Sequence, residues 1–297
     1  MAVRRRNARN SSPPHVAVVG AGNLARALAV ALSNAGYAID VVPSRNHRAS
    51  QRHAEILAQQ VHSRAEAIHK TGITTDIVWL CVPDAAIAAV AQSLARSGDW
   101  KGKIALHSSG ALTSRELASL RRQGAAVASV HPLMTFVKGS EASLSEVPFA
   151  IEGDATAVRH ARVIVNRLGG HPFSIRKQDK VAYHAWGTFA SPLLTALLAT
   201  TEHVAAAAGV SAAAARKRIQ PILRQTIANY LAMGAGGAFS GPIVRGDVKV
   251  VEQHLRILRS VPQAREVYVA LAHAAMQYLP GKKREEMKKH LNGNIRR

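Results

Sequence analysis

The sequence is poor in cysteine, aromatic residues and acidic residues, and each shortage excludes a class of protein. Its one cysteine, Cys81, excludes an internal disulfide and lies in the apolar run 77–82, where a buried structural thiol in a reducing compartment is expected. Only 4% of the 297 residues are aromatic while 47% are hydrophobic, so small aliphatic side chains carry the core and favour close helix packing. No spacing of His, Cys, Asp and Glu typical of a metal site is present, and we expect no metal.

Long hydrophobic runs are also lacking. The uncharged stretch 185–201 is shorter than a membrane span and contains Pro192, so we predict no transmembrane helix. The apolar stretch 16–21 that follows the arginine-rich beginning is too short for the core of a signal peptide and suits a strand better. These absences predict a cytoplasmic protein.

Charge of one sign dominates, with 39 Lys and Arg against 18 Asp and Glu and a formal net charge of +21. Much of the excess lies at the two ends, which we expect to be a disordered basic leader over residues 1–14 and a basic tail over residues 281–297. A basic surface attracts nucleic acid, but no aromatic platform and no zinc spacing accompany this charge. Nucleic-acid binding is therefore the less favoured interpretation.

Two domains are expected, because 297 residues exceed the usual size of one compact domain. Strands alternate with helices as far as residue 175, which predicts an α/β domain with a doubly wound parallel sheet, a Rossmann fold, over residues 15–176. The expected strands are 16–19, 39–43, 77–82, 103–106, 125–130, 148–151 and 173–175, with helices at 24–35, 55–61, 85–96, 114–123 and 156–168. Helices alone follow at 181–208, 212–233, 248–258 and 263–278, which predicts an all-helical second domain over residues 177–280.

The first strand and helix are joined by a motif typical of dinucleotide binding. The letters Gly20-Ala21-Gly22-Asn23-Leu24-Ala25 match G-x-G-x-x-A, and the position between a strand and a helix makes the match informative. Gly20 permits the tight turn, Gly22 lets the backbone approach a pyrophosphate, and Ala25 allows close packing of helix on strand. The alternative is an ordinary glycine-rich turn.

The tip of the second strand indicates which dinucleotide is bound. NAD enzymes usually place an acid there to accept hydrogen bonds from the ribose, but this tip reads Ser44-Arg45, and Asp40 lies at the beginning of the strand. A guanidinium donates charge-assisted hydrogen bonds to a 2′-phosphate, so Ser44 and Arg45 predict NADP(H). The alternative for Arg45 is a solvated surface side chain.

Further motifs resemble those of a known family. They are Val82-Pro83-Asp84, His107-Ser108-Ser109-Gly110-Ala111-Leu112, His131-Pro132-Leu133-Met134-Thr135-Phe136, Tyr183-His184-Ala185 and Gly241-Pro242-Ile243-Val244-Arg245-Gly246-Asp247. Over residues 15–275 the chain resembles the Rossmann-like NADP oxidoreductases whose C-terminal half is a domain of unknown function. These are similar to ketopantoate, pyrroline-5-carboxylate and deazaflavin-linked NADP reductases.

The resemblance implies an NADP domain that includes Val82 and Pro83 in its cofactor site. It also implies a helical domain like that of 6-phosphogluconate dehydrogenase and the reduction of a small carbonyl or imine, with ketopantoate reduction in some relatives. One departure is Ser191-Pro192, where the family commonly has Ser-Asn. A lost Asn implies altered contacts with the substrate.

A polar stripe at the beginning of the second domain predicts the proton chemistry. Lys180 and His184 lie one helical turn apart, and Thr188 and Ser191 continue the same face. An ammonium beside a nicotinamide can stabilise the charge that develops on a reduced oxygen and donate a proton, so we expect Lys180 to be the acid and His184 its orienting partner. The alternative is a lysine at a helix beginning and a capping histidine.

Three other residues are candidates for substrate contacts. Ser109 and His131 follow strand ends, where open α/β sheets bind ligands, and the hydroxyl and N–H groups of 108–110 could hold a carboxylate. Arg245 lies in a Gly/Pro turn and could reach a carboxylate, or it could form a local ion pair with Asp247. A satisfied structural turn is the alternative for Ser109 and His131.

The sequence therefore predicts an NADPH-dependent oxidoreductase that reduces a small carbonyl or imine, with a 2-oxo acid such as ketopantoate as the candidate substrate. The alternative is a non-catalytic NADP-binding sensor or scaffold protein. A small-molecule substrate and a homodimer are expected, since helical domains of this type often dimerise.

Overall fold

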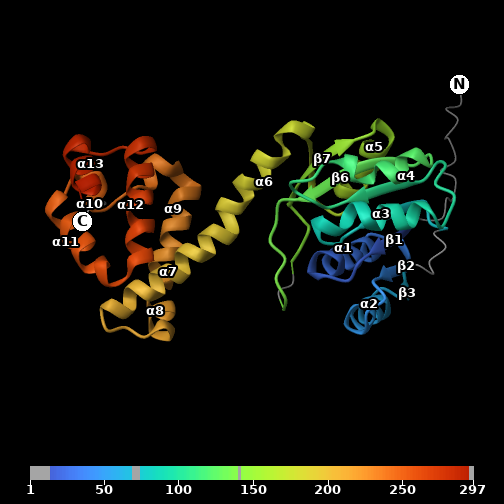
Figure 1. The fold of residues 1–297 in the computed structure, drawn as a ribbon, viewed down its shortest axis with the longest axis horizontal. Helices are drawn as coiled ribbons and strands as arrows, with labels where there is room; N and C mark the ends of the chain where they lie inside the picture. The colour runs from blue at the N-terminus through green and yellow to red at the C-terminus, as the bar shows by residue number, and fades with distance from the viewer. Residues whose placement is uncertain (1–13, 69–73, 140–141, 294–297) are drawn as a thin grey trace, which may run out of the picture. The chain divides into compact units, whose positions relative to one another are not determined.

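The computed structural model describes residues 14–68, 74–139 and 142–293, and the chain divides into two compact units, 1–188 and 189–297. The first unit holds a β-sheet with helices on both faces, and the second is built from helices (Figure 1). The first unit extends twelve residues beyond the boundary expected near 176. The reason is that Lys180 and Tyr183 are buried there against residues of the sheet and its loops.

The first unit follows the expected alternation of strands and helices. Its strands are β1 His15–Val19, β2 Ala38–Ser44, β3 Arg64–Ala67, β4 Ile77–Leu80, β5 Ile104–His107, β6 Ala126–Pro132, β7 Pro148–Gly153 and β8 His171–Ser174. Its α-helices are α1 Asn23–Asn34, α2 Arg48–Gln60, α3 Ile87–Ala95, α4 Ala118–Arg122, α5 Ala155–Arg167 and α6 Lys180–Thr188. Short 3-10 turns are η1 Asp84–Ala86, η2 Ser114–Leu117 and η3 Lys177–Asp179.

The eight strands form one sheet in the order β3-β2-β1-β4-β5-β6-β7-β8. All neighbours are parallel except β6 and β7, so the predicted doubly wound parallel sheet is confirmed, with one antiparallel pair that was not predicted. The described residues of the segment 133–147 form no crossover helix, and a chain that returns without one pairs antiparallel. The edge strand β3 was missed because Arg-Ala-Glu-Ala has no apolar run.

The sheet is doubly wound about β1. The chain passes from β1 outward to β2 and β3 and then returns to β4 on the other side of β1, which makes the β1/β4 gap the topological switch point. The register pairs Val19 with Leu80, Leu80 with His107, and His107 with Ser129. The carboxyl ends of β1, β4 and β5 therefore lie side by side at one edge of the sheet. β6 lies next to β5 and extends three residues further, to Pro132.

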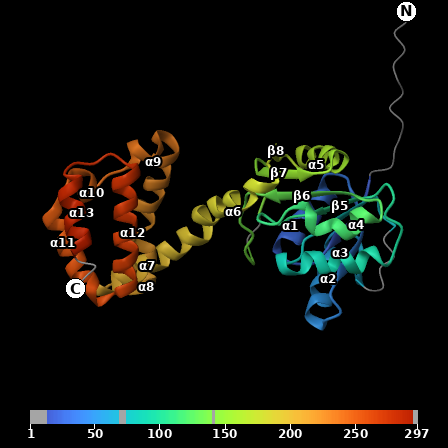
Figure 2. The same cartoon turned by 45° about the horizontal axis from the view of Figure 1, so that its top comes forward.

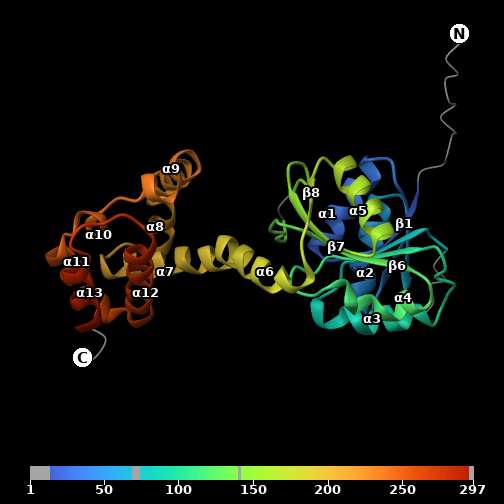
Figure 3. The same ribbon diagram turned by 90° about the horizontal axis from the view of Figure 1, so that it is seen from above.

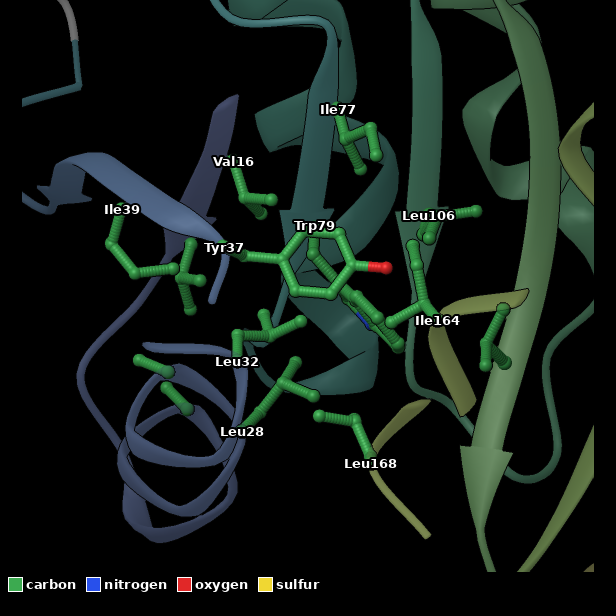
Figure 4. Close-up of a cluster of buried hydrophobic side chains, with 14 of the residues drawn as sticks. Val16, Leu28, Leu32, Tyr37, Ile39, Ile77, Trp79, Leu106, Ile164 and Leu168 are labelled. Atoms are coloured by element: carbon green, nitrogen blue, oxygen red, sulfur yellow. The ribbon is translucent and has the colours of Figure 1, made fainter. Parts of the chain in front are cut away.

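Both faces of the sheet are covered, because alternate residues of each strand face opposite sides. Val16 and Val18 join the core under α1 and α5, whereas Ala17 and Val19 join the core under α3 and α4. Figure 3 shows these helix pairs on opposite sides of the sheet. Figure 4 shows the first core, in which Trp79 from β4 lies among apolar side chains of β1, α1 and α5.

The second unit contains more helical breaks than its sequence indicated. Its elements are the π-helical turn η4 Phe189–Leu193, α7 Leu194–Ala207, α8 Ala212–Arg218, α9 Gln220–Ala238, α10 Pro242–Arg245, α11 Val248–Ile257, η5 Leu258–Ser260, α12 Pro262–Tyr278 and α13 Arg284–Gly293. The helix expected at 181–208 is interrupted at η4, which contains Pro192. Proline lacks the N–H that an α-helix needs, and a π-helical turn accommodates the lost hydrogen bond.

The expected basic tail is also corrected. Residues 284–293 form α13, and its Met287 and Leu291 are buried with Val251 and Leu255 of α11. Figure 2 shows α11, α12 and α13 gathered together. The spacing of four residues places Met287 and Leu291 on one helix face, and the charged residues around them concealed that short apolar stripe.

No single helix in the described residues is long and apolar enough to span a membrane. Two consecutive helical segments, Lys177–Ala207 and Ala212–Arg218, reach the length and apolar composition of a membrane span only when they are counted together, and the chain bends by 114° between them.

Candidate functional site

The loop after β1 has the geometry of a dinucleotide-binding turn. Gly20 has a φ of 107°, and a Cβ there would lie 2.5 Å from the carbonyl oxygen of Cys81, so glycine is required. Gly22 is the N-cap of α1, and no described atom lies within 4 Å of the position that its Cβ would take. The first turn of α1 therefore begins beside open space, and the free N–H groups at a helix N-terminus suit an anion there. Ala25 is fully buried and lets the helix approach the strands.

Two exposed arginines follow the end of β2, which is the neighbour of β1 in the sheet. Ser44 ends β2 with a buried side chain, Arg45 follows it, and Arg48 begins α2, both arginines being exposed. Within the residues that the structure describes, neither guanidinium has an ion pair or hydrogen bond. Asp40 is engaged elsewhere, because its carboxylate pairs with His15 Nδ1 at 2.6 Å. The tip itself, residues 43–48, contains no acid, and Glu66 on the neighbouring strand β3 is paired with Arg64.

The other residues predicted to contact the cofactor lie around the same loop. Val82 follows β4, and its Cγ1 lies 3.4 Å from the Cβ position of Gly20, while Pro83 is exposed. Leu24 is half-buried in the first turn of α1. The Nδ2 of Asn23 donates a hydrogen bond to the carbonyl oxygen of Phe136 at 3.1 Å, which ties the beginning of α1 to the segment after β6.

The loop after β5 is fixed by buried hydrogen bonds that begin at His107. Its Nδ1 accepts from the N–H of Ser109 at 3.1 Å, and its Nε2 donates to the carbonyl oxygen of Thr113 at 3.0 Å. Burial lowers the pKa of His107 to about 4, so the ring is neutral at pH 7. Both ring nitrogens are occupied, and His107 is a structural residue.

The serine hydroxyls that were expected to hold a substrate are occupied by the protein. Ser108 Oγ accepts from Trp79 Nε1 at 2.8 Å. Ser109 Oγ donates to Asp84 Oδ2 at 2.8 Å and accepts from the N–H of Leu112 at 2.9 Å. Ser109 therefore shapes this loop, and its hydroxyl has no spare proton for a ligand.

Two histidines meet beside Gly110. A Cβ on Gly110 would lie 2.5 Å from His184 Cδ2 and 2.8 Å from His131 Nε2. The two imidazole rings are 6.1 Å apart between centroids and nearly perpendicular. The structure thus brings together three predicted site residues, Ser109 from the loop after β5, His131 from β6 and His184 from α6.

His131 is neutral and has a phenol as its partner. Its Nδ1 lies 2.9 Å from the hydroxyl of Tyr183, and the two rings are in edge-on contact. Burial, assisted by the positive charge of Lys180, lowers the pKa of His131 to about 3. Burial also raises the pKa of Tyr183, so the phenol stays protonated. Tyr183 was not predicted as a site residue, although its place beside His184 in the quoted motif was the available signal.

Lys180 is buried and hydrogen-bonded to the loop after β5. Its side chain has no exposed surface, and its Nζ donates to the carbonyl oxygen of Ser109 at 3.0 Å and to Ser129 Oγ at 2.7 Å. Burial lowers its pKa to about 8, against the attraction of Glu152 and Asp84. The roles predicted for Lys180 as acid and His184 as its orienting partner stay predictions. In the structure α6 begins against the sheet and directs the side chain of Lys180 inward.

Arg245 belongs to the second unit. It ends α10, and its Nε donates to Asp247 Oδ2 at 2.8 Å. This contact is the local ion pair that was the alternative for Arg245, and the guanidinium remains largely exposed.

Comparisons with known proteins agree with the two-part architecture. Residues 5–132 match the model of a Rossmann-like domain, and residues 147–275 match the family described as Domain of unknown function (DUF2520). No curated protein matches the chain in sequence.

Several solved structures share the fold. A Bacteroides fragilis protein, BF3122, assigned as an NADP oxidoreductase, is 21% identical with a TM-score of 0.76 over 89% of this chain and 98% of its own. An imine reductase from Pseudomonas sp. is 21% identical with a TM-score of 0.61 over 89% and 94%. A reductive aminase from Aspergillus terreus, in complex with NADPH and ethyl-5-oxohexanoate, is 18% identical with a TM-score of 0.64 over 89% and 94%. At these identities the likeness establishes the fold.

Proposed function

This chain joins a Rossmann-like domain to the domain of unknown function DUF2520, and we propose that it is an NADPH-dependent reductase of a small carbonyl or imine compound. The observation that carries the proposal is the position of His131 in β6 and His184 in α6 against Gly110, in the loop after β5. This loop lies at the same edge of the sheet as the Gly20–Gly22 loop after β1, with β4 between the two strands. In open α/β sheets this edge at the switch point is where ligands bind. The names of the structural neighbours, which are NADP oxidoreductases and imine reductases, support it.

The residues present fit an NADP(H) dinucleotide. The open space at Gly22 leaves room for a pyrophosphate at the N-terminus of α1, and the unpaired guanidiniums of Arg45 and Arg48 suit a 2′-phosphate. When bound, NADPH supplies the electron pair for the reduction. The protein's own residues must then bind the substrate and neutralise the charge that develops on its heteroatom.

His131 is the residue best placed for that task. Because its pKa is about 3, it acts as a neutral imidazole that donates one hydrogen bond. We assign that hydrogen to Nε2, since the protonated phenol of Tyr183 can donate to Nδ1 and hold the ring in this tautomer. A neutral donor placed where negative charge develops stabilises the transition state, and the exposed His184 beside it is accessible for proton exchange with solvent.

The candidate substrate class is a 2-oxo acid such as ketopantoate, with cyclic imines as the other class to be tested. A panel of both, followed by NADPH absorbance, tests the reaction directly. In the presence of a substrate that is turned over, Tyr183→Phe should lower kcat about 10-fold or more and leave the Kd for NADPH unchanged, because the phenol acts through His131. Tyr230→Phe, at an exposed tyrosine of α9, is the matched control. Wild-type kcat in Tyr183→Phe would remove the His131–Tyr183 pair from the mechanism.

The cofactor preference has its own test. Wild-type protein should bind NADPH roughly 10–150-fold more tightly than NADH, since a charge-assisted hydrogen bond contributes about 1.5–3 kcal/mol. Arg45→Ala should reduce this ratio, whereas Arg52→Ala, at an exposed position further along α2, should keep it. Titrations of nucleotide fluorescence measure both. Equal affinities of the wild type for NADPH and NADH would contradict the NADP assignment.

The competing proposal is a non-catalytic NADP-binding sensor or scaffold. It gains support if NADPH binds as expected while no member of the substrate panel is reduced. The neutral His131 and its hydrogen bond to Tyr183 favour the enzyme, because a half-buried imidazole held in one orientation is a costly feature for a protein that only binds nucleotide.

We also propose a homodimer. The 19-residue helix α9 buries none of its own side chains, and Ile222 and Leu231 on it are 65% and 76% exposed. Exposed apolar surface of this kind is typical of subunit interfaces. Light scattering should give twice the chain mass, and Leu231→Lys should reduce it; a monomeric wild type would contradict the proposal.

A further inference from the structure

The peptide group between Ser109 and Gly110 is the most constrained backbone unit in the site. Its carbonyl oxygen accepts from Lys180 Nζ at 3.0 Å and from Ser129 Oγ at 3.2 Å, and Lys180 Nζ also donates to Ser129 Oγ. All three residues have buried side chains, so the carbonyl points into the protein. Burying an ammonium group costs free energy. A buried lysine that donates to a single backbone oxygen and a serine hydroxyl therefore requires a structural or functional reason.

The opposite end of the same peptide group has no partner. Within the part of the chain that the structure describes, neither the N–H of Gly110 nor that of Ala111 donates a hydrogen bond, although Gly110 is buried. A trans peptide directs its N–H away from its C=O. Because the carbonyl of Ser109 points toward Lys180, the N–H of Gly110 points away from that buried cluster. A buried N–H without an acceptor is rare unless a ligand or water supplies one.

The surroundings of this N–H are those of the reacting centre. Gly110 carries no side chain, and the positions that a Cβ would take are filled by His184 and His131. The hydroxyl of Ser109 donates to Asp84 and that of Ser108 accepts from Trp79, so the backbone N–H groups of Gly110 and Ala111 are free donors of this loop among the described residues. Hydrogen bonds to a carbonyl polarise the whole peptide group and strengthen its N–H as a donor.

The charged groups around Lys180 leave its charge available to this peptide. Glu152 on β7 accepts from the N–H and hydroxyl of Ser114 and lies 3.8 Å from Lys177. Asp84 in η1 accepts from Ser109 Oγ. Neither carboxylate is hydrogen-bonded to Lys180, whose two observed acceptors are the Ser109 carbonyl and Ser129.

We infer that Lys180 is a positioning residue, which holds and polarises the Ser109–Gly110 peptide so that the Gly110 N–H binds a carboxylate oxygen of the substrate beside His131. The inference rests on the proposed function for the identity of the reacting centre. The substrate is then a compound with a carboxylate next to the carbon that is reduced. Lys180 strengthens the binding of that carboxylate and does not transfer a proton.

The test observes the Gly110 N–H directly. Protein labelled with 13C at serine carbonyls and 15N at glycine gives correlated signals only for Ser–Gly peptides, of which the chain has three, ending at Gly98, Gly110 and Gly241. The probe is oxamate in the presence of NADP+, and methyl oxamate is the uncharged control. The Gly110 amide proton should move downfield on addition of oxamate, while the Gly98 and Gly241 signals stay in place.

Variants then test the role of Lys180. Lys180→Met should weaken oxamate binding about 10-fold or more, the effect expected from one charge-assisted hydrogen bond, and leave the affinities for methyl oxamate and NADPH unchanged. Ser129→Ala removes one donor to the same carbonyl and should give a smaller loss in the same direction, which keeps the test usable if Lys180→Met does not fold. Lys177→Met removes a nearby lysine that does not contact the peptide and should bind oxamate as the wild type does.

The outcomes separate this inference from the proposed function. A Gly110 signal that stays in place at every oxamate concentration, or wild-type oxamate affinity in both Lys180→Met and Ser129→Ala, overturns the inference. A responding Gly110 signal with no NADPH-dependent turnover of any panel substrate keeps the carboxylate subsite and removes the proposed reaction.

Discussion

The glycine-rich loop offers a pair of substitutions that separate folding from cofactor binding. At Gly20 an added Cβ would lie 2.5 Å from the carbonyl oxygen and 3.1 Å from the carbonyl carbon of Cys81, in the backbone of the neighbouring strand segment. At Gly22 it would meet nothing within 4 Å among the described residues. Gly20→Ala should therefore destabilise the first unit, whereas Gly22→Ala should affect what binds there.

The magnitudes follow from the two geometries. An alanine at positive φ costs about 1–2 kcal/mol, and Gly20 has a φ of 107°. Displacing the Cys81 backbone adds about 1–3 kcal/mol, the usual cost of overpacking, so the free energy of unfolding should fall by about 2–5 kcal/mol. Gly22 has a φ of −76°, which alanine adopts freely, and its substitution should change stability by less than about 1 kcal/mol.

Tryptophan fluorescence measures the stability of the first unit alone. The three tryptophans of the chain, Trp79, Trp100 and Trp186, all lie in it, and the first two are fully buried. For a unit of this size the loss at Gly20 corresponds to a fall in Tm of roughly 4–20 °C. The Kd for NADPH should rise about 10-fold or more in Gly22→Ala, because the methyl group occupies the space that a phosphate needs.

The reasoning is refuted if the two variants are equally stable, or if Gly22→Ala binds NADPH as tightly as the wild type. The first result would mean that the Gly20–Cys81 approach relaxes without cost. The second would mean that the phosphate does not approach Gly22, and the loop would then be an ordinary turn.

Two further predictions concern stability. The folded-state pKa of His107, about 4, lies below the ordinary value of 6.5, so the unfolded state binds more protons between these values. His107 alone should therefore remove roughly 3 kcal/mol from the stability of the first unit as the pH falls from 6.5 to 4, in addition to the loss from His131. His107→Gln should flatten that part of the pH profile of urea unfolding, while His160→Gln, at an exposed position of α5, should leave it unchanged; an unaltered slope in His107→Gln would contradict the assignment. Leu291→Ala should destabilise the second unit by about 2–5 kcal/mol, because its side chain is fully buried. Circular dichroism should show an earlier helical transition while the tryptophan transition stays in place, and an unchanged circular dichroism melt would show that α13 contributes nothing to the core.

Some features were predictable because their requirements are local. The turn at Gly20, the beginning of α1 and the buried strands β1 and β4 each follow from a few neighbouring residues, since glycine geometry, helix capping and apolar runs act over short distances. The absence of an acid at the end of β2 could likewise be seen in the sequence. Asp40, which lies earlier in the strand, is paired with His15 in the structure.

Other features depend on partners far away in the chain. The strand β3 and the helix α13 have little apolar character of their own, and pairing with β2 or packing on α11 determines them. The antiparallel return of β7 depends on the absence of a helix in the described residues after β6, which the alternation of strands and helices did not indicate.

The sequence alone determined that Lys180 and His184 lie on one helix, that Ser109 follows a strand, and that a dinucleotide loop precedes them. His131, which was expected just after a strand, lies in the last residues of β6. Only the tertiary structure decided which groups these residues contact. Lys180 reaches the Ser109 carbonyl across 71 residues, and Tyr183 reaches His131 across 52. Helical spacing fixes which side chains share a face, but the packing of α6 on the sheet fixes which way that face points, and hence which groups are buried and which meet a substrate.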